Sequence, residues 1–263
     1  MRGAALIEIL VALVIGLVVV GAVLATYVTT GQTGRLQSAL AQMDEDAQIG
    51  LRILSNDLLM AGYARPVSLS SETSLLTKTY NGRAVFGCDK GFKSAADNAP
   101  AECGGSVHSP AIEITYEADL FNSVVTGGRP SDCLGNSFQD AESGLTHNRY
   151  RANGGALQCT GPKGNAAPLV DNVERLQFWY GEADSADLRK LVRYVKASAV
   201  QDFSHVLSVR VCLLISSAEA VITAEDHALK LYVDCDLEPR ESTDGHLYRA
   251  YFGTTALRNK IPF

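Results

Sequence analysis

The sequence predicts an α+β fold in which one long N-terminal helix precedes an antiparallel β-sheet. Apolar residues fill the start of the chain and then recur at helical spacing, whereas short alternating segments mark the second half. The chain also has six cysteines, an even number behind an export-like segment. They predict disulfide-stapled loops and a location outside the cytoplasm.

The N-terminal segment is apolar enough to enter a membrane. From Ile9 to Val28 only Thr26 and Tyr27 carry polar side-chain atoms, and no residue is charged. A helix of about 20 such residues can cross a bilayer. Glu8 stands just before this run, and because a carboxylate in a membrane segment is costly, Glu8 is a candidate functional residue.

Three kinds of segment fit this pattern. A plain membrane anchor tolerates Glu8 at the membrane interface. An ordinary secretory signal would be cleaved after Val23-Leu24-Ala25, but such signals rarely carry an acid in their apolar region. The third kind explains the acid: Arg2-Gly3, followed by Ala4-Ala5-Leu6-Ile7-Glu8 and a long apolar helix, resembles the class III leader of type IV pilins.

The resemblance implies a processing site and an assembly contact. A prepilin peptidase would cleave between Gly3 and Ala4 and methylate the new amine of Ala4. Glu8 would become the fifth residue of the mature chain and pair with the N-terminal ammonium of a neighbouring subunit, since a carboxylate in an apolar bundle needs a cation. Pilins usually start the mature chain with Phe, and the Ala4 start is closer to another minor pilin type, PilV.

The helical period continues beyond the apolar run. One apolar stripe recurs at spacings of three and four residues and consists of Leu36, Leu40, Met43, Ala47, Leu51, Leu54 and Leu58. It ends at Met60-Ala61-Gly62, so a helix starting at Ala4 would be about 87 Å long. A single stripe favours a helix packed on its own globular domain over a coiled coil, with weak points at Gly31 and Gly34.

The rest of the chain predicts strands separated by loops. Residues 67–110 and 120–166 are expected to be loop-rich, and strands are predicted at 111–117, 169–180, 191–195, 206–215, 229–235 and 248–257. The organisation is then a leader at 1–3, a transmembrane or filament-core helix at 4–28, the amphipathic half of that helix at 29–62 and a β-rich globular domain at 67–263.

Blocks of the helix end and the second half resemble the PilW type of minor pilin. They are the helix end Asp57–Tyr63, the segments Leu169–Gly181 and Val206–Leu214, and the C-terminal segment Tyr248–Lys260 with its Leu257-Arg258-Asn259. The resemblance implies a type IV pilin fold and a minor pilus subunit that helps to start the filament and sits near its tip. The implied partners are other minor pilins, the major pilin, prepilin peptidase and a tip adhesin. The implied location is the inner membrane of a Gram-negative bacterium, with the globular domain in the periplasm and later outside the cell.

The six cysteines are expected to pair in sequential order. The expected disulfides are Cys88–Cys103, Cys133–Cys159 and Cys212–Cys235, out of 15 connectivities that six cysteines allow. The first two would staple long loops, each contributing about 3 kcal/mol in the chain-entropy account. The third would tie two neighbouring strands.

Composition and motifs argue against other functions. The net charge is −6 without a basic block, which argues against a nucleic-acid partner. The histidines (His108, His147, His205, His227 and His246) lack metal-ligand spacing and are expected at the surface, and Glu182, Asp184 and Asp187 lack EF-hand spacing, so a solvated turn is favoured over a calcium loop. No catalytic or nucleotide-binding motif is present, so neither an enzyme nor a cofactor is predicted.

Two alternatives remain open at this point. A minor pseudopilin of a type II secretion system would have an identical leader, although the C-terminal blocks favour the pilus. A periplasmic binding protein released by an ordinary signal would share the disulfides but would start at Thr26.

Overall fold

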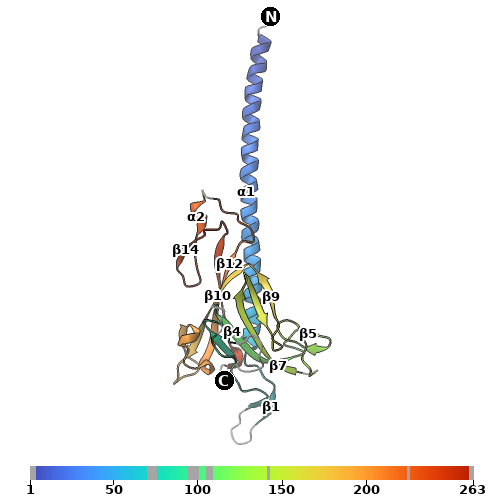
Figure 1. Ribbon diagram of the computed structural model, residues 1–263, viewed down its shortest axis with the longest axis vertical. Helices are drawn as coiled ribbons and strands as arrows, with labels where there is room; N and C mark the ends of the chain where they lie inside the picture. The colour runs from blue at the N-terminus through green and yellow to red at the C-terminus, as the bar shows by residue number, and fades with distance from the viewer. Residues whose placement is uncertain are drawn as a thin grey trace.

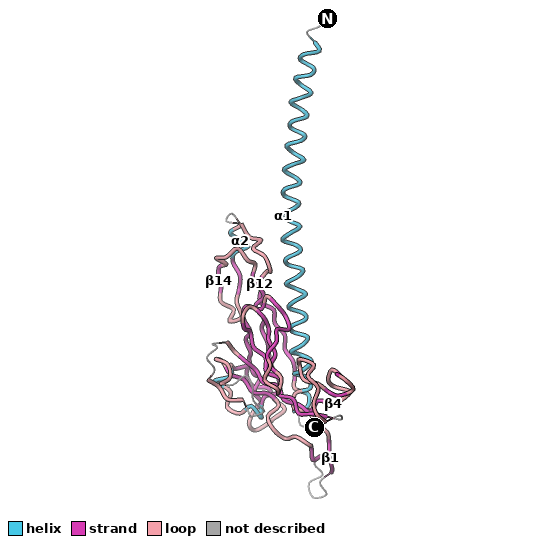
Figure 2. The backbone as a smooth tube through the Cα atoms, turned by 45° about the vertical axis from the view of Figure 1, so that its right-hand side comes forward, coloured by secondary structure: helices cyan, strands magenta, loops and turns pink. Residues whose placement is uncertain are grey.

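The computed structural model describes residues 4–69, 76–93, 101–104, 109–140, 143–223 and 226–260. The chain opens with one helix, α1 (Ala4–Met60), whose upper half stands alone and whose lower half lies against β-sheets (Figure 1). Its 57 residues extend for roughly 85 Å. Figure 2 shows the same division, with the strands gathered around the lower part of α1.

The first large sheet has five strands in the order β3-β4-β7-β8-β9, and all neighbours are antiparallel. Its strands are β3 (Val85–Cys88), β4 (Ala111–Asp119), β7 (Ser143–Asn153), β8 (Ala156–Thr160) and β9 (Ala166–Asp171). β4 is buried along its whole length, so this sheet forms part of the core of the globular domain.

The second large sheet has four strands in the order β11-β10-β12-β15, again antiparallel. Its strands are β10 (Val173–Ala183), β11 (Leu191–Val195), β12 (Val206–Ser216) and β15 (Tyr248–Ala256). The apolar sequence of β12 suits a central strand that is covered on both faces.

Three two-stranded hairpins and several short helices complete the described part of the chain. The hairpin strands are β1 (Pro66–Leu69), β2 (Leu76–Lys78), β5 (Val125–Thr126), β6 (Arg129–Pro130), β13 (Leu231–Val233) and β14 (Pro239–Glu241). The short helices are η1 (Ala197–Ala199), η2 (Phe203–His205), α2 (His227–Lys230) and η3 (Arg258–Lys260).

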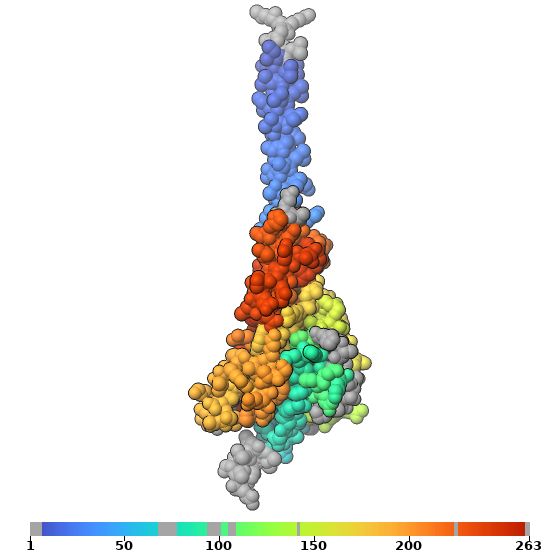
Figure 3. Space-filling view, turned by 60° about the vertical axis from the view of Figure 1, so that its left-hand side comes forward, coloured from blue at the N-terminus to red at the C-terminus, as the bar shows by residue number. Residues whose placement is uncertain are grey.

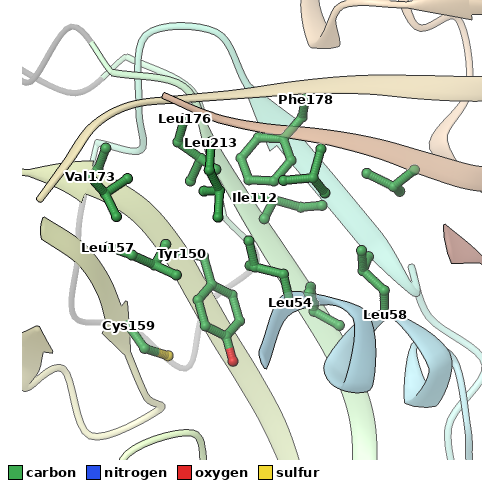
Figure 4. Packing of buried hydrophobic residues seen from close by; sticks show 14 of the residues in the cluster. Leu54, Leu58, Ile112, Tyr150, Leu157, Cys159, Val173, Leu176, Phe178 and Leu213 are labelled. Atoms are coloured by element: carbon green, nitrogen blue, oxygen red, sulfur yellow. The ribbon is translucent and has the colours of Figure 1, made fainter. Parts of the chain in front are cut away.

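One hydrophobic core joins α1 to both sheets. Leu54 and Leu58 of α1 point toward Ile112 of the first sheet and toward Leu176 and Leu213 of the second (Figure 4). All five side chains are fully buried. The long helix on antiparallel sheets, with disulfides, confirms the predicted α+β class.

Several predicted boundaries are wrong. The segment 169–180 is not one strand, because Asn172 adopts a positive φ of 61° and the chain passes there from β9 to β10, in the other sheet. The segment 229–235 begins in α2, and β13 covers only its middle. The regions 67–110 and 120–166, expected to be loop-rich, contribute four strands to the five-stranded sheet or its edge.

Candidate functional site

The upper half of α1 is an apolar surface with nothing to cover it in the described part of the chain. Its apolar window is long enough to cross a membrane, and none of it is buried. Ile7, Leu17 and Tyr27 are 67%, 77% and 78% exposed. Removing apolar surface from water is favourable by about 25 cal/mol per Å². Burial of this segment in a bilayer or against other helices would therefore stabilise it.

The residues of the predicted processing and assembly site lie at the tip of this segment. Ala4 opens α1, and Glu8 follows one turn later with an exposed side chain. Gly3 lies outside the described residues. Within the described part of the chain no ion pair involves Glu8.

Polar groups at the middle of α1 are satisfied within the helix. The hydroxyls of Thr26, Thr29 and Thr33 donate to the carbonyl oxygens four residues earlier, at 2.9, 3.0 and 3.0 Å. Gly31 and Gly34 lie in this stretch, yet α1 continues through both of them without a break. The apolar and amphipathic halves are therefore one continuous helix.

The lower half of α1 approaches the second sheet very closely. A Cβ atom at Gly50 would stand 2.8 Å from Cδ1 of Leu213, so a side chain at position 50 would force Leu213 to shift. Ala47 and Met43, about two and three turns above the buried Leu54, are also buried. The predicted apolar stripe is thus the face that packs on the globular domain.

A buried carboxylate fixes the end of α1 to the first sheet. Asp57 Oδ1 accepts a hydrogen bond from the Tyr116 hydroxyl at 3.0 Å, and Oδ2 accepts from Asn148 Nδ2 at 2.7 Å and from the Tyr150 hydroxyl at 2.6 Å. Burial raises the pKa of Asp57, and the three hydrogen bonds oppose that shift only in part. This cluster sets the angle between the helix and β4 and β7.

Polar contacts also join α1 to β15. Asp44 accepts hydrogen bonds from the Tyr251 hydroxyl and, at 3.4 Å, from Arg249. About three helical turns lower, the hydroxyls of Thr255 and Ser55 are 3.0 Å apart. These contacts place the odd-numbered side chains of β15 on the helix side of the second sheet.

The last turn of α1 is capped from far along the chain. Asn259 Nδ2 donates to the carbonyl oxygens of Leu59, Met60 and Ala61, at 3.1, 3.3 and 3.3 Å. Helix ends leave such carbonyls without partners, and a side-chain donor satisfies them. Asn259 is part of the Leu-Arg-Asn block that the sequence singled out, and capping gives that block a structural role.

The segment that leaves α1 is clamped to β4 through Arg65 and Glu117. Arg65 N and Nε donate to the two carboxylate oxygens of Glu117, at 2.8 and 2.7 Å, and the Thr79 hydroxyl also donates to Glu117. Burial alone would raise the pKa of Glu117, but these hydrogen bonds outweigh it and lower the pKa to about 2.

The six cysteines form three disulfides in the sequential order that the sequence predicts. The Cα–Cα distances are 5.4 Å for Cys88–Cys103, 6.5 Å for Cys133–Cys159 and 5.7 Å for Cys212–Cys235. The third bond differs from expectation in what it joins. Cys235 lies in the turn between β13 and β14, so the bond ties that hairpin to β12 and does not link neighbouring strands.

The acidic loop is occupied by protein contacts. Glu182 accepts from Arg193 and from the amide of Gln201, while Asp184 and Asp187 accept from amides two residues later. Within the described residues no group of three or more metal-binding side chains occurs. His108 lies outside those residues. His147, His205 and His246 are half-buried and not fully at the surface as expected, and only His227 is exposed.

Sequence reasoning missed Asp57 as an anchor and Glu117 as a clamp. The sequence position of Asp57 could have predicted its burial, because Asp57 immediately precedes Leu58 of the apolar stripe and therefore lies beside the buried face. The position of Glu117 gives no such indication, since its partner Arg65 is 52 residues away and only the fold brings the two together.

Residues 138–259 match the family model of PilW, the type IV pilus-assembly protein W. Among solved structures, a type IV-like pilin from Thermus thermophilus is similar at 17% sequence identity with a TM-score of 0.40, over 87% of this chain and 99% of that chain. No curated protein matches the chain. Residues 138–259, somewhat less than half of the chain, thus carry the match to the PilW family of type IV pilus-assembly proteins, and this match points to a structural pilus subunit and not to an enzyme.

Proposed function

We propose that this chain is a minor pilin that takes part in starting a type IV pilus and lies near the tip of the filament. The exposed apolar half of α1 carries the proposal, because it is continuous with a helix that is firmly packed on a globular domain. Such a segment can leave the bilayer only if equivalent helices cover it. A filament with a helical core supplies that cover.

The proposed processing follows the leader. Residues 1–3 are removed by prepilin peptidase between Gly3 and Ala4, and the amine of Ala4 is methylated. Residues 4–28 form the membrane and filament-core segment, residues 29–62 form the packed half of the helix, and residues 67–263 form the globular domain. Glu8 then pairs with the N-terminal ammonium of a neighbour, an interaction strengthened by apolar surroundings.

The shape of the molecule supports a place near the tip. The globular domain is much wider than the helix above it (Figure 3). Two disulfides, Cys88–Cys103 and Cys133–Cys159, belong to this domain. A broad domain of this kind is easier to place at an end of the filament than to repeat along a tightly packed shaft.

The proposed location and partners follow from the same helix. The chain is held in the inner membrane with its globular domain in the periplasm, and it becomes extracellular once assembled. Its partners are other minor pilins, the major pilin and a tip adhesin, besides prepilin peptidase during processing. No nucleic-acid partner and no cofactor are proposed.

Mass analysis of the N-terminus in two fractions tests the proposal. The chain would be isolated from sheared surface filaments and from membranes, and the first peptide identified in each. A methylated Ala4 in both fractions is the expected result. Methylated Ala4 in membranes alone would favour a secretion pseudopilus, and a start at Thr26 would overturn the pilin assignment.

A further inference from the structure

The outer edge of β15 presents unpaired backbone groups. β15 is the last strand of its sheet, and within the described residues no other strand pairs with its free side. Its ladder with β12 is flanked by hydrogen bonds from Leu257 N to Leu207 O at 2.8 Å and from Ser217 N to Leu247 O at 2.9 Å. The nine residue pairs between these bonds run without a register shift.

The two flanking bonds fix which residues of β15 face outward. In an antiparallel ladder, hydrogen-bonded pairs alternate with non-bonded pairs. Both flanking bonds involve odd-numbered residues of this segment, so residues 249, 251, 253 and 255 bond to β12. Ala250, Phe252 and Thr254 therefore direct their N–H and C=O groups away from the sheet.

The side chains divide in the same way. Odd-numbered side chains face α1, as the Asp44–Tyr251 and Ser55–Thr255 contacts show. Phe252 lies on the other face, with its ring centroid 6.3 Å from that of Trp179, and is 45% exposed. α1 therefore covers one face of β15 and leaves an aromatic side chain on the other face beside the free edge.

The other edge strands of the two large sheets are protected in the ways usual for natural proteins. β9 contains Pro168 and a register shift, and β11 has five residues and a register shift. β3 has four residues and ends at the Cys88 disulfide. β15 has nine residues, no proline and no shift. The long, regular and unprotected edge is thus confined to one strand.

We infer that this edge binds an extended segment of a different protein, which pairs with β15 as a fifth strand of the sheet. A row of N–H and C=O groups at strand spacing is matched by another extended backbone. A groove of about 330 Å³, lined by Arg52 and Ser55 of α1 and by Thr254, lies beside the lower part of β15. Side chains of the added strand alternate between this groove, which Leu51 and Val211 also line, and the exposed ring of Phe252.

A second copy of the chain does not fit this edge. Two identical edges can pair only in antiparallel fashion, about a two-fold axis perpendicular to the sheet. Because α1 lies along the sheet, a rotation about that axis makes α1 of the second copy point in the opposite direction to α1 of the first. The two apolar N-terminal segments would then point in opposite directions and could not enter one membrane from the same side. The inference rests on β15 and this orientation, and it holds for a pilus and a pseudopilus alike.

Amide hydrogen exchange of the full-length chain tests the inference. The chain is compared after purification alone in mild detergent and after mild extraction from native membranes with its partners. We expect the amides of Phe252 and Thr254 to exchange at least tenfold more slowly in the native extract, while those of Tyr251 and Gly253 are slow in both. Equal exchange of Phe252 and Thr254 in the two samples would overturn the inference.

Two substitutions at Thr254 test whether the outward N–H groups of β15 bond to the added strand. Thr254→Pro removes an outward N–H and leaves the bonds to β12 intact, whereas Thr254→Val keeps the N–H. A photoreactive phenylalanine analogue at position 252 of the full-length chain reports the neighbour in membranes. We expect the cross-link to reach an extended segment of a different polypeptide, to persist in Thr254→Val and to fall at least fivefold in Thr254→Pro.

Three results would overturn the inference: no adduct, an adduct to β15 of a second copy, or equal yields in the two variants. Exchange of the Tyr251 and Gly253 amides in purified Thr254→Pro shows whether the variant keeps its internal ladder. If the ladder is lost, the exchange comparison on the unsubstituted chain decides the question alone.

Discussion

The Tyr180 ring lies directly against Gly87, so that a Cβ atom at position 87 would stand 1.9 Å from the Tyr180 hydroxyl oxygen and 2.4 Å from Cζ. Gly87 belongs to β3 of the first sheet and Tyr180 to β10 of the second. The Tyr180 ring therefore occupies the space that a side chain at position 87 would fill. This contact locks the two sheets together.

Gly87→Ala should destabilise the globular domain by about 1–3 kcal/mol, the usual cost of overpacking a core. The added methyl group must push aside a fully buried ring. Chemical unfolding of the full-length chain in detergent, under oxidising conditions, measures the change. Gly34→Ala is the matched control, because a Cβ atom there meets nothing within 4 Å. Equal stability of Gly87→Ala and the unsubstituted chain would contradict the predicted lock.

Two buried tyrosines should respond in opposite ways to loss of the hydroxyl. The Tyr180 hydroxyl has no hydrogen-bond partner in the described part of the chain, whereas that of Tyr150 donates to Asp57. Tyr180→Phe should leave stability unchanged or raise it, and Tyr150→Phe should lower it by about 1–3 kcal/mol. Unfolding midpoints of the two variants give the comparison. A larger loss for Tyr180→Phe would refute the assignment of these partners.

The Asp57 cluster predicts a stability contribution that fades as pH rises. Burial holds the pKa of Asp57 above its ordinary value. The contribution of protonated Asp57 to the free energy of unfolding is complete below the unfolded pKa of about 3.9. It is lost as pH rises through the higher folded-state pKa. Relative to Asp57→Asn, the unsubstituted chain should therefore gain stability as the pH is lowered toward 4. A difference that does not vary with pH would count against this account.

Glu117 predicts the opposite pH dependence. Its pKa of about 2 in the folded chain lies below the unfolded value of about 4.3. The carboxylate contributes stability that is present above the unfolded pKa and is lost as pH falls through the folded-state value. Glu117→Gln should be less stable than the unsubstituted chain at pH 7, and this deficit should shrink between pH 4.3 and 2. A constant deficit across that range would show that the clamp is not electrostatic.

Glu8→Ala tests the proposed ion pair during assembly. The substitution removes the carboxylate but leaves the Gly3–Ala4 bond and the apolar run intact, so cleavage should be normal and incorporation into filaments should fall at least tenfold. Mass analysis of Ala4 in membranes and immunodetection in sheared filaments measure the two steps separately. Ile9→Ala, an apolar truncation at the next position, is the control. Normal incorporation of Glu8→Ala would sink the ion-pair account.

The helix was predictable because its apolar stripe is a local signal. The spacing of Leu54 and Leu58 predicts the buried face of α1, and that face packs on the globular domain as expected. β7 was missed because its polar residues hide a strand pattern. Asn148 and Arg149 are buried on it, and each is matched by a distant partner, Asp57 and Glu113 respectively. Such pairings depend on the complete fold, and local spacing carries no trace of them.

The cap on α1 has a consequence for the order of folding. Asn259 is separated by 200 residues from Leu59, whose carbonyl it binds. A chain that is inserted by its N-terminal helix and exported from that end acquires the cap last. Until residue 259 arrives, the base of α1 keeps free carbonyl groups and β15 is not yet in place beside it. A chain truncated before Asn259 would therefore keep uncapped carbonyl groups at the end of α1, and the helix would lose this link to the C-terminal segment.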